Sequence, residues 1–182
     1  MLHVTRYTLH DKKGFTLIEL IIAISIIGIM SAIIVPQYTK YRDSKSLFLG
    51  AEQVVGDIRM VQNYAYSILK DNGSFPVGGY GIHFSKNSNI YIIFADKDGD
   101  MEYDSGNENF KEIKLPEGVK ITSLKVDTAD NADVDLVFTS PYGKVFIDKE
   151  NKISGNFIGL EIIVSNNGGS KTINMSSSRL VN

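Results

Sequence analysis

Carboxylates are the residues of this 182-residue chain whose spacing best suits chemistry. Six of them fall within the 13 residues from 96 to 108, and Lys97 alone offsets their charge. They are Asp96, Asp98, Asp100, Glu102, Asp104 and Glu108. Hard oxygen ligands at alternate positions are what Ca²⁺ prefers in proteins. The run is therefore a candidate calcium site, and calcium is the one cofactor that the sequence suggests.

The first three of these carboxylates resemble the first three ligands of an EF-hand loop. The pattern then departs from that motif, because Gly99 precedes the third ligand, Met101 holds the sixth position and Asn107 the twelfth. Strands rather than helices are also expected on either side. A solvated acidic loop between two strands, with glycines at its turns, is the alternative interpretation, and both stay open here.

Nothing in the pattern of residues points to catalysis. There are no cysteines, and His3, His10 and His83 are too far apart for a short metal-binding spacing. Gly78-Gly79-Tyr80-Gly81 lacks the Rossmann spacing, and no Walker loop or zincin motif occurs. Scattered serines and His83 are more often structural or solvated than catalytic. We therefore expect a protein that is not an enzyme and has no small-molecule substrate.

One further carboxylate interrupts a membrane-type sequence. Residues 15–35 contain a single ionisable side chain, Glu19, among Ile, Leu and Ala. A helix of that length spans about 30 Å, the thickness of a bilayer core. A secretory signal peptide has a shorter apolar core that ends in a small-residue cleavage site. The run therefore predicts a transmembrane helix, in which a lone charge is costly.

Three basic residues, Arg6, Lys12 and Lys13, precede this helix. Positive residues favour the cytoplasmic side of a membrane span. The sequence thus predicts a single-pass protein of the inner (cytoplasmic) membrane whose C-terminal part is extracytoplasmic.

The start of the apolar run resembles the processing site of type IV pilins and type II secretion pseudopilins. The matching residues are Gly14-Phe15-Thr16-Leu17-Ile18-Glu19-Leu20, and the match continues through Pro36 and Tyr38. The resemblance implies that a prepilin peptidase cleaves between Gly14 and Phe15 and that the new N-terminal Phe15 is methylated. Residues 1–14 would then be a cytoplasmic leader. The mature subunits would assemble into a helical filament, extracellular or periplasmic.

The resemblance also gives Glu19 a role in assembly. Cleavage creates a new amine on Phe15, and Glu19 of one subunit can face that amine on a neighbour. A charge that is costly in the isolated subunit is then compensated after docking. The alternative is a carboxylate that reaches the headgroup layer, because Glu19 lies only four residues into the mature chain.

Beyond Pro36, which should kink or locally open the helix, apolar residues recur at alternating spacings of four and three. This stripe comprises Leu47, Ala51, Val54, Ile58, Val61, Ala65 and Ile68. It predicts an amphipathic half of the same helix over 36–70. The turn signal Asp71-Asn72-Gly73 follows it.

Residues 71–182 alternate between short β-branched or aromatic segments and turn-rich clusters. Strands are expected at 80–84, 90–95, 110–115, 120–126, 134–139, 144–147, 160–164 and 171–175. Short, closely spaced strands favour antiparallel sheets. The predicted fold class is α+β: a long N-terminal helix, membrane half over 15–35, packed through its amphipathic half on a C-terminal antiparallel β-rich domain.

Within the family, three features resemble the minor, H-type pseudopilins. They are Val55–Gln62, Phe138–Gly143 and the hairpin signal Leu160–Gly168. Major pilins often carry a disulfide-closed C-terminal loop, which a chain without cysteine cannot form. The resemblance implies a structural subunit, a minor pilin or pseudopilin, of a type IV pilus-like or type II secretion filament. Its partners would be the prepilin peptidase, other pilin subunits, the inner-membrane assembly platform and the membrane.

The alternative function is that of a DNA-binding minor pilin in a DNA-uptake pilus. Such a role needs exposed basic residues. The net charge is −2, and the C-terminal region offers Lys171 and Arg179, which are more simply part of a solvated face. Nucleic acid is therefore not the expected partner.

Overall fold

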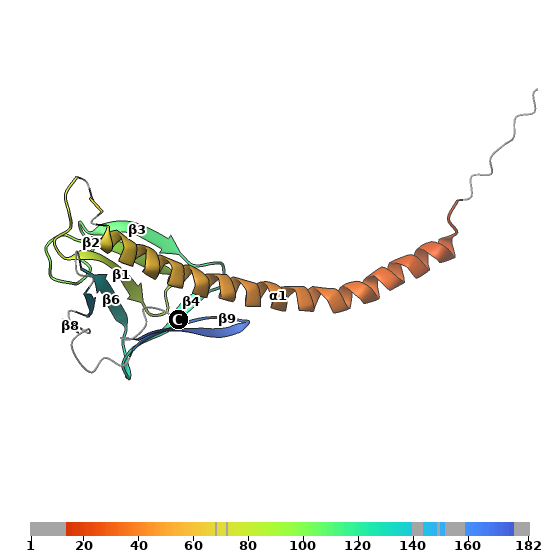
Figure 1. The fold of residues 1–182 in the computed structure, drawn as a ribbon. Coiled ribbons are helices and arrows are strands. Elements are labelled where there is room, and N and C mark those ends of the chain that lie inside the picture. Colours follow the sequence, from red (N-terminus) through yellow and green to blue (C-terminus); the bar gives the residue numbers. More distant parts are fainter. Residues whose placement is uncertain are drawn as a thin grey trace, which may run out of the picture. The chain divides into compact units, whose positions relative to one another are not determined.

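The computed structural model describes residues 14–67, 69–71, 73–139, 144–148, 150–151 and 159–176 (Figure 1). Most of the expected leader, together with Ile68, Asn72 and Arg179, lies outside them. The chain divides into two compact units, Met1–Thr39 and Lys40–Asn182. The helix α1, Leu17–Tyr66, begins in the first unit and ends in the second.

In the first unit, α1 exposes apolar side chains. An 18-residue window of the helix has a mean hydropathy of 2.7, so by length and composition it can cross a membrane. The hydroxyls of Ser25 and Ser31 donate to the carbonyls of Ile21 and Ile27, each at 2.7 Å. These bonds satisfy polar groups that lipid could not. The helix continues through Pro36.

Antiparallel strands build the second unit and form two sheets, ordered β3-β2-β1-β6-β7-β8 and β10-β9-β4-β5. The larger sheet contains β1 Gly79–Ser85, β2 Ile90–Asp96, β3 Asn109–Lys114, β6 Asp133–Phe138, β7 Val145–Ile147 and β8 Glu150–Asn151. The smaller sheet contains β4 Lys120–Val126, β5 Ala129–Asp130, β9 Leu160–Asn166 and β10 Gly169–Met175. The expected α+β fold, with one long helix and antiparallel sheets, is confirmed.

The expected strands are all present, each with ends within two residues of those observed. The two-residue strands β5 and β8 were not expected, because so short a segment leaves no periodic signal. The predicted end of the helix is a few residues late. The amide of Leu69 donates to the carbonyl of Tyr64, five residues back, at 3.2 Å. This wider turn, of a kind found at helix C-termini, ends the regular pattern before the glycine signal.

The apolar stripe of α1 packs into the core of the second unit. Its described members, from Leu47 to Ala65, are each at most 6% exposed and share one apolar cluster with both sheets. Two hydrogen bonds add specificity to this packing. Tyr91 donates to the carboxylate of Asp57, and Tyr80 donates to the carbonyl of Leu69 at 3.2 Å. Burial and the Asp57 charge raise the pKa of Tyr91, so its hydroxyl stays a donor.

Candidate functional site

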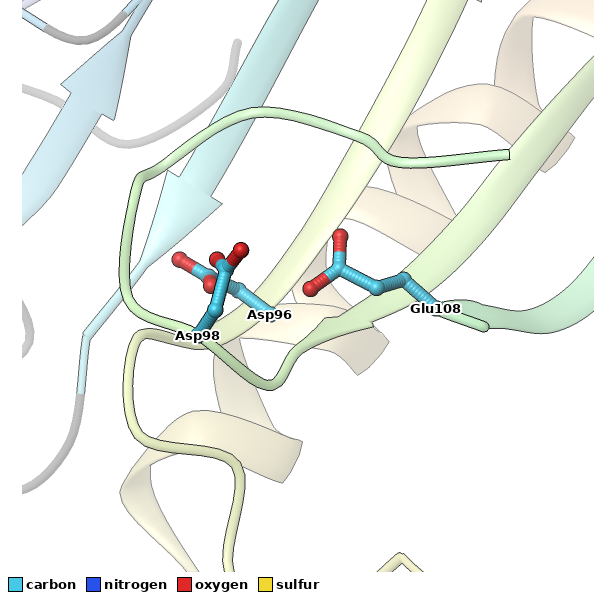
Figure 2. A group of neighbouring side chains, drawn as sticks. All are labelled: Asp96, Asp98 and Glu108. Atoms are coloured by element: carbon cyan, nitrogen blue, oxygen red, sulfur yellow. The ribbon is translucent and has the colours of Figure 1, made fainter. Parts of the chain in front are cut away.

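The acidic run connects two neighbouring strands of the larger sheet, because Asp96 ends β2 and Glu108 immediately precedes β3. Figure 2 shows Asp96, Asp98 and Glu108 close together at the base of this connection. One carboxylate oxygen from each lies within 4.8 Å of the others. In the described part of the chain, Asp100, Glu102 and Asp104 do not join this group.

Asp96 is buried, so the interpretation of a wholly solvated loop is wrong at this residue. Its Oδ1 accepts the amide of Gly99 at 2.7 Å, and its Oδ2 accepts that of Met101 at 3.0 Å. Burial raises the pKa of Asp96 to about 6, although both amide hydrogen bonds oppose that rise. A Cβ on Gly78 would lie 1.7 Å from Oδ2, so only glycine leaves room for this carboxylate.

Glu108 is the second buried carboxylate, at 2% exposed. Its Oε1 accepts the amide of Lys97 at 2.7 Å, and its Oε2 accepts the amide of Asp104 at 3.1 Å. The two buried carboxylates therefore hold the backbone of their own loop, as Asp and Asn commonly do in turns. Each carboxylate has about four acceptor positions, so these bonds leave capacity for a cation.

The acidic loop, residues 97–108, also covers part of the sheet. The ring of Tyr103 lies 5.5 Å from that of Phe94 and 4.9 Å from that of His83. Its amide donates to Asp135 Oδ2 at 3.3 Å. Neighbouring side chains of a strand point to opposite faces of the sheet, and Ile93 points into the core shared with α1. Phe94 therefore points to the opposite face, yet it is also fully buried. The loop thus shields the face of the sheet opposite the α1 core.

His83 joins a hydrogen-bonded row that the sequence did not reveal, because its members lie on different strands. Its Nδ1 lies 2.7 Å from Asp135 Oδ1, and its Nε2 lies 3.1 Å from Ser85 Oγ. Burial lowers the pKa of His83. The hydrogen bond to Asp135 and the charges of Asp135, Asp133 and Asp148 outweigh that effect, so the pKa of His83 is raised above its usual value.

This row has the residue types of a hydrolase triad. The raised pKa of His83 favours its protonated form. That form donates from both ring nitrogens and is a poorer proton acceptor than neutral imidazole. The row therefore acts as a clamp that ties β1 to β6 and, through Asp135, to the acidic loop.

The N-terminal junction lies just before α1. Phe15 is 93% exposed, and a Cβ built on Gly14 would have nothing within 4 Å. Glu19 accepts hydrogen bonds from the amide and the hydroxyl of Thr16, at 2.8 and 2.7 Å. The amide of Glu19 donates to the Thr16 hydroxyl at 3.3 Å. This reciprocal pair is a capping box.

The capping box gives Glu19 a partner in its own chain. The sequence suggested a carboxylate without such a partner, whereas in the structure it accepts two hydrogen bonds from Thr16. The spacing Thr-x-x-Glu at a helix start was the signal that could have predicted them.

Comparisons with known proteins find similarity in the segment that contains this N-terminal junction. Residues 9–35 match the family model described as the prokaryotic N-terminal methylation motif. A fimbrial protein of Pseudomonas aeruginosa is 28% identical over 128 residues, which cover 70% of this chain and 68% of the relative. The type IV major fimbrial protein FimA of Dichelobacter nodosus is 63% identical over 30 residues, 16% of this chain and 19% of FimA. No solved structure matches the chain.

The N-terminal segment of this chain is thus similar to that of type IV fimbrial proteins. The pilin-like N-terminal segment, residues 9–35, contains Gly14, Phe15, Thr16 and Glu19. The acidic loop and the His83 row lie outside it, so they are features of the second unit.

Proposed function

We propose that this protein is a structural subunit, a minor pilin or pseudopilin, of a type IV pilus-like or type II secretion filament. The observation that carries the proposal is the match of residues 9–35 to the N-terminal methylation motif. The apolar membrane half of α1 and the fimbrial relatives support it. The absence of cysteine favours a minor subunit, since it excludes the disulfide-closed loop of many major pilins.

Processing by a prepilin peptidase is the first step of this function. Cleavage after Gly14 would remove 14 residues, and Phe15 would become a methylated N-terminus. The exposed junction supports it, because a peptidase must reach an extended backbone and glycine offers no side chain to obstruct it. The positive residues of the leader would keep it in the cytoplasm, with the second unit extracytoplasmic.

Mass spectrometry of the protein from sheared filaments tests the proposal. We expect a chain that begins at N-methylated Phe15. A Gly14→Ala substitution tests the cleavage site, because it should impair cleavage and leave more unprocessed chain in the membrane. An intact Met1 terminus in assembled filaments would contradict processing, and absence from the filament fraction would contradict the structural role.

Assembly would bring further partners. Other pilin subunits would pack along α1, and an inner-membrane platform would add each subunit to the filament. Glu19 would meet the Phe15 amine of a neighbour, leaving its Thr16 bonds or sharing them. Before assembly, the two hydrogen bonds from Thr16 would lower the free-energy cost of placing the Glu19 charge in the apolar segment.

The alternative, a DNA-binding minor pilin, has little support in the described residues. Lys171 places its Nζ 4.2 Å from the centre of the Phe48 ring, and Arg179 lies outside those residues. A salt-dependent affinity of the whole protein for single-stranded DNA would favour this alternative.

Calcium binding by the acidic loop stays a prediction. Asp96, Asp98 and Glu108 converge, and oxygen ligands suit Ca²⁺. The same carboxylates bind the amides of their own loop, which explains their placement without a metal.

A further inference from the structure

The second unit has a groove at one end. It has a volume of about 520 Å³ and lies between α1 near Ser44 and the turn that joins β9 to β10. Asn166 fixes this turn, because its Nδ2 donates to the carbonyl of Asp43 at 2.6 Å and to Ser46 Oγ at 3.1 Å. A Cβ on Gly168 would lie 3.1 Å from the amide nitrogen of Ser44, so glycine permits the close approach. The groove is therefore held by the side chain of Asn166 and by the close backbone approach at Gly168.

The groove is both apolar and basic. Tyr41 is 64% exposed and Phe48 is 47% exposed, although both are large aromatic residues. Lys45 and Lys171 also line it, and the Lys171 ammonium lies over the Phe48 ring. Residues 40–49 and 166–171 carry four cations and one carboxylate, namely Lys40, Arg42, Lys45, Lys171 and Asp43. A partner for this groove should offer an apolar side chain beside negative charge.

The other end of the same unit has that complementary character. Here the chain between α1 and β1 exposes Phe75 by 51% and Val77 by 76%. A Cβ on Gly99 would lie 3.2 Å from Val77 Cγ1, which places the acidic loop directly beside this segment. Asp98 and Asp100, on either side of Gly99, are exposed. We call these five residues the tip.

The β9–β10 hairpin, which borders the groove, and the chain that follows α1, which carries the tip, lie toward opposite ends of the stretch of α1 within this unit (Figure 1). The groove adjoins Asp43 and the tip segment follows Tyr66, which separates them by about 35 Å of helix. One molecule can therefore present its tip to a second while its groove receives the tip of a third.

We infer that the tip of one molecule docks into the groove of a second copy of this chain, with Phe75 or Val77 against Tyr41 and Phe48 and the tip carboxylates beside the groove lysines. Different patches meet, so the contact is heterologous. Heterologous contacts repeat into open helical filaments when the rotation does not close a ring. The inference rests on the proposed function and assigns the surfaces through which the second units would touch.

A single-stranded nucleic acid is another occupant with some chemical fit, since such ligands stack on aromatic rings in basic grooves. A second copy is favoured because the matching apolar and acidic surface is present on the same chain, whose net charge is −2.

Cysteine crosslinking tests the contact in whole filaments, because the chain has no native cysteine. Ser170→Cys marks the groove and Val77→Cys marks the tip, and both residues are exposed. With a short bis-maleimide, the double variant should give a ladder of covalent multimers. Coexpressed single variants should give a dimer and no larger species. Each single variant alone should stay monomeric.

Charge reversal tests the electrostatic part. Lys45→Glu with Lys171→Glu should reduce the ladder at least several-fold. Adding Asp98→Lys with Asp100→Lys should restore most of it.

The matched control reverses the exposed cations of β3, with Lys111→Glu and Lys114→Glu. This control should leave the ladder unchanged, because it alters the same net charge away from the groove.

Protein that is present in sheared filaments but gives no ladder would overturn the inference and leave the proposed function standing. Protein that is absent from filaments would overturn both. A dimer from Val77→Cys alone would mean an isologous contact and would overturn the head-to-tail arrangement. Protection of Ser170→Cys from maleimide by single-stranded DNA, without a ladder, would assign the groove to nucleic acid instead.

Discussion

At the residue scale, the carboxylates of this protein differ chiefly in what they accept. Glu19 accepts the amide and hydroxyl of Thr16, whereas Asp96 and Glu108 each accept two amides of their own loop. A carboxylate with such bonds is stabilised in its ionised form. A charge that looks misplaced in a sequence can therefore be satisfied within a few residues of itself.

Substitution of Glu19 should separate membrane insertion from assembly. Glu19→Ala removes a charge from the apolar run, so the amount of protein in the membrane should be unchanged or higher. Its incorporation into sheared filaments should fall strongly, because the amine of a neighbouring Phe15 loses its acceptor. Immunoblots of membrane and filament fractions measure both quantities. Wild-type incorporation would argue against a role in assembly.

Thr16 should act on the start of the helix. Thr16→Val keeps the side-chain shape but removes the hydroxyl that completes the capping box. The amides of Glu19, which donates to the Thr16 hydroxyl, and Leu20, which donates to the Thr16 carbonyl, should exchange several-fold faster with solvent deuterium in detergent micelles, because caps stabilise helix ends. Thr16→Ser, which retains the hydroxyl, should exchange as the wild type does. Equal protection in both variants would show that the box is not maintained.

At the element scale, the acidic loop combines two tasks that a strand connection need not have. It shields Phe94 on the outer sheet face through Tyr103, and its carboxylates hold its own backbone. The His83 row links β1, β6 and this loop. The loop is thus anchored at its ends by buried carboxylates and at its middle by an aromatic stack.

The His83 row should make stability depend on pH. The pKa of His83 is raised in the folded protein, so protonation favours the folded state. Its contribution should be complete below the unfolded pKa, about 6.5, and should decline as pH rises through the higher folded pKa. Denaturant unfolding at pH 6 and pH 8 should show lower stability at pH 8, and His83→Gln should reduce this difference.

The matched control for that experiment is Asp104→Asn, an exposed carboxylate of the same loop. It should keep the difference between pH 6 and pH 8. If His83→Gln also keeps the full difference, another group is responsible.

Calcium should raise the melting temperature if the loop binds it. Ligands that bind only the folded state stabilise it by mass action, so millimolar Ca²⁺ should raise the midpoint of thermal unfolding and a chelator should reverse the rise. Asp98→Ala with Glu108→Gln should abolish it, whereas Asp104→Ala, outside the converging group, should not. Identical melting temperatures with calcium and with chelator would leave backbone capping as the role of these carboxylates.

At the scale of the whole molecule, one helix serves two environments. Residues 17–39 expose apolar side chains, and residues from Leu47 onward bury a stripe in a β-rich core. Substituting the same type of apolar residue should therefore have different effects in the two parts of α1.

Two isoleucine substitutions on this helix should separate those consequences. Ile58→Ala removes a side chain that is 1% exposed and should lower the free energy of unfolding of the second unit by about 2–5 kcal/mol. Ile33→Ala, at 58% exposed, should leave that free energy unchanged but lower incorporation into filaments. Denaturant unfolding in detergent and filament shearing measure the two effects. Equal unfolding energies for both variants would contradict the assigned core.

The sequence alone determined the features that repeat or lie close together along the chain. The apolar run, the stripe from Leu47 to Ala65 and the alternating strands are periodic, and periodicity reports directly which face of an element is buried. The Gly14-Phe15 junction could also be recognised from the sequence, because it belongs to a motif of consecutive residues. Even the Thr16–Glu19 capping box was readable in principle, because its partners are three residues apart.

Only the tertiary structure decided which distant residues meet. Asp135 reaches His83 across 52 positions of sequence, and Asn166 reaches Asp43 across 123. It also selected Asp96, Asp98 and Glu108 from six similar carboxylates, since the loop turns back on itself and buries two of them. Sheet pairing and loop closure depend on the packing of the whole unit, and no local spacing encodes them. The groove and the tip belong to this second class, because each joins segments that are distant along the chain.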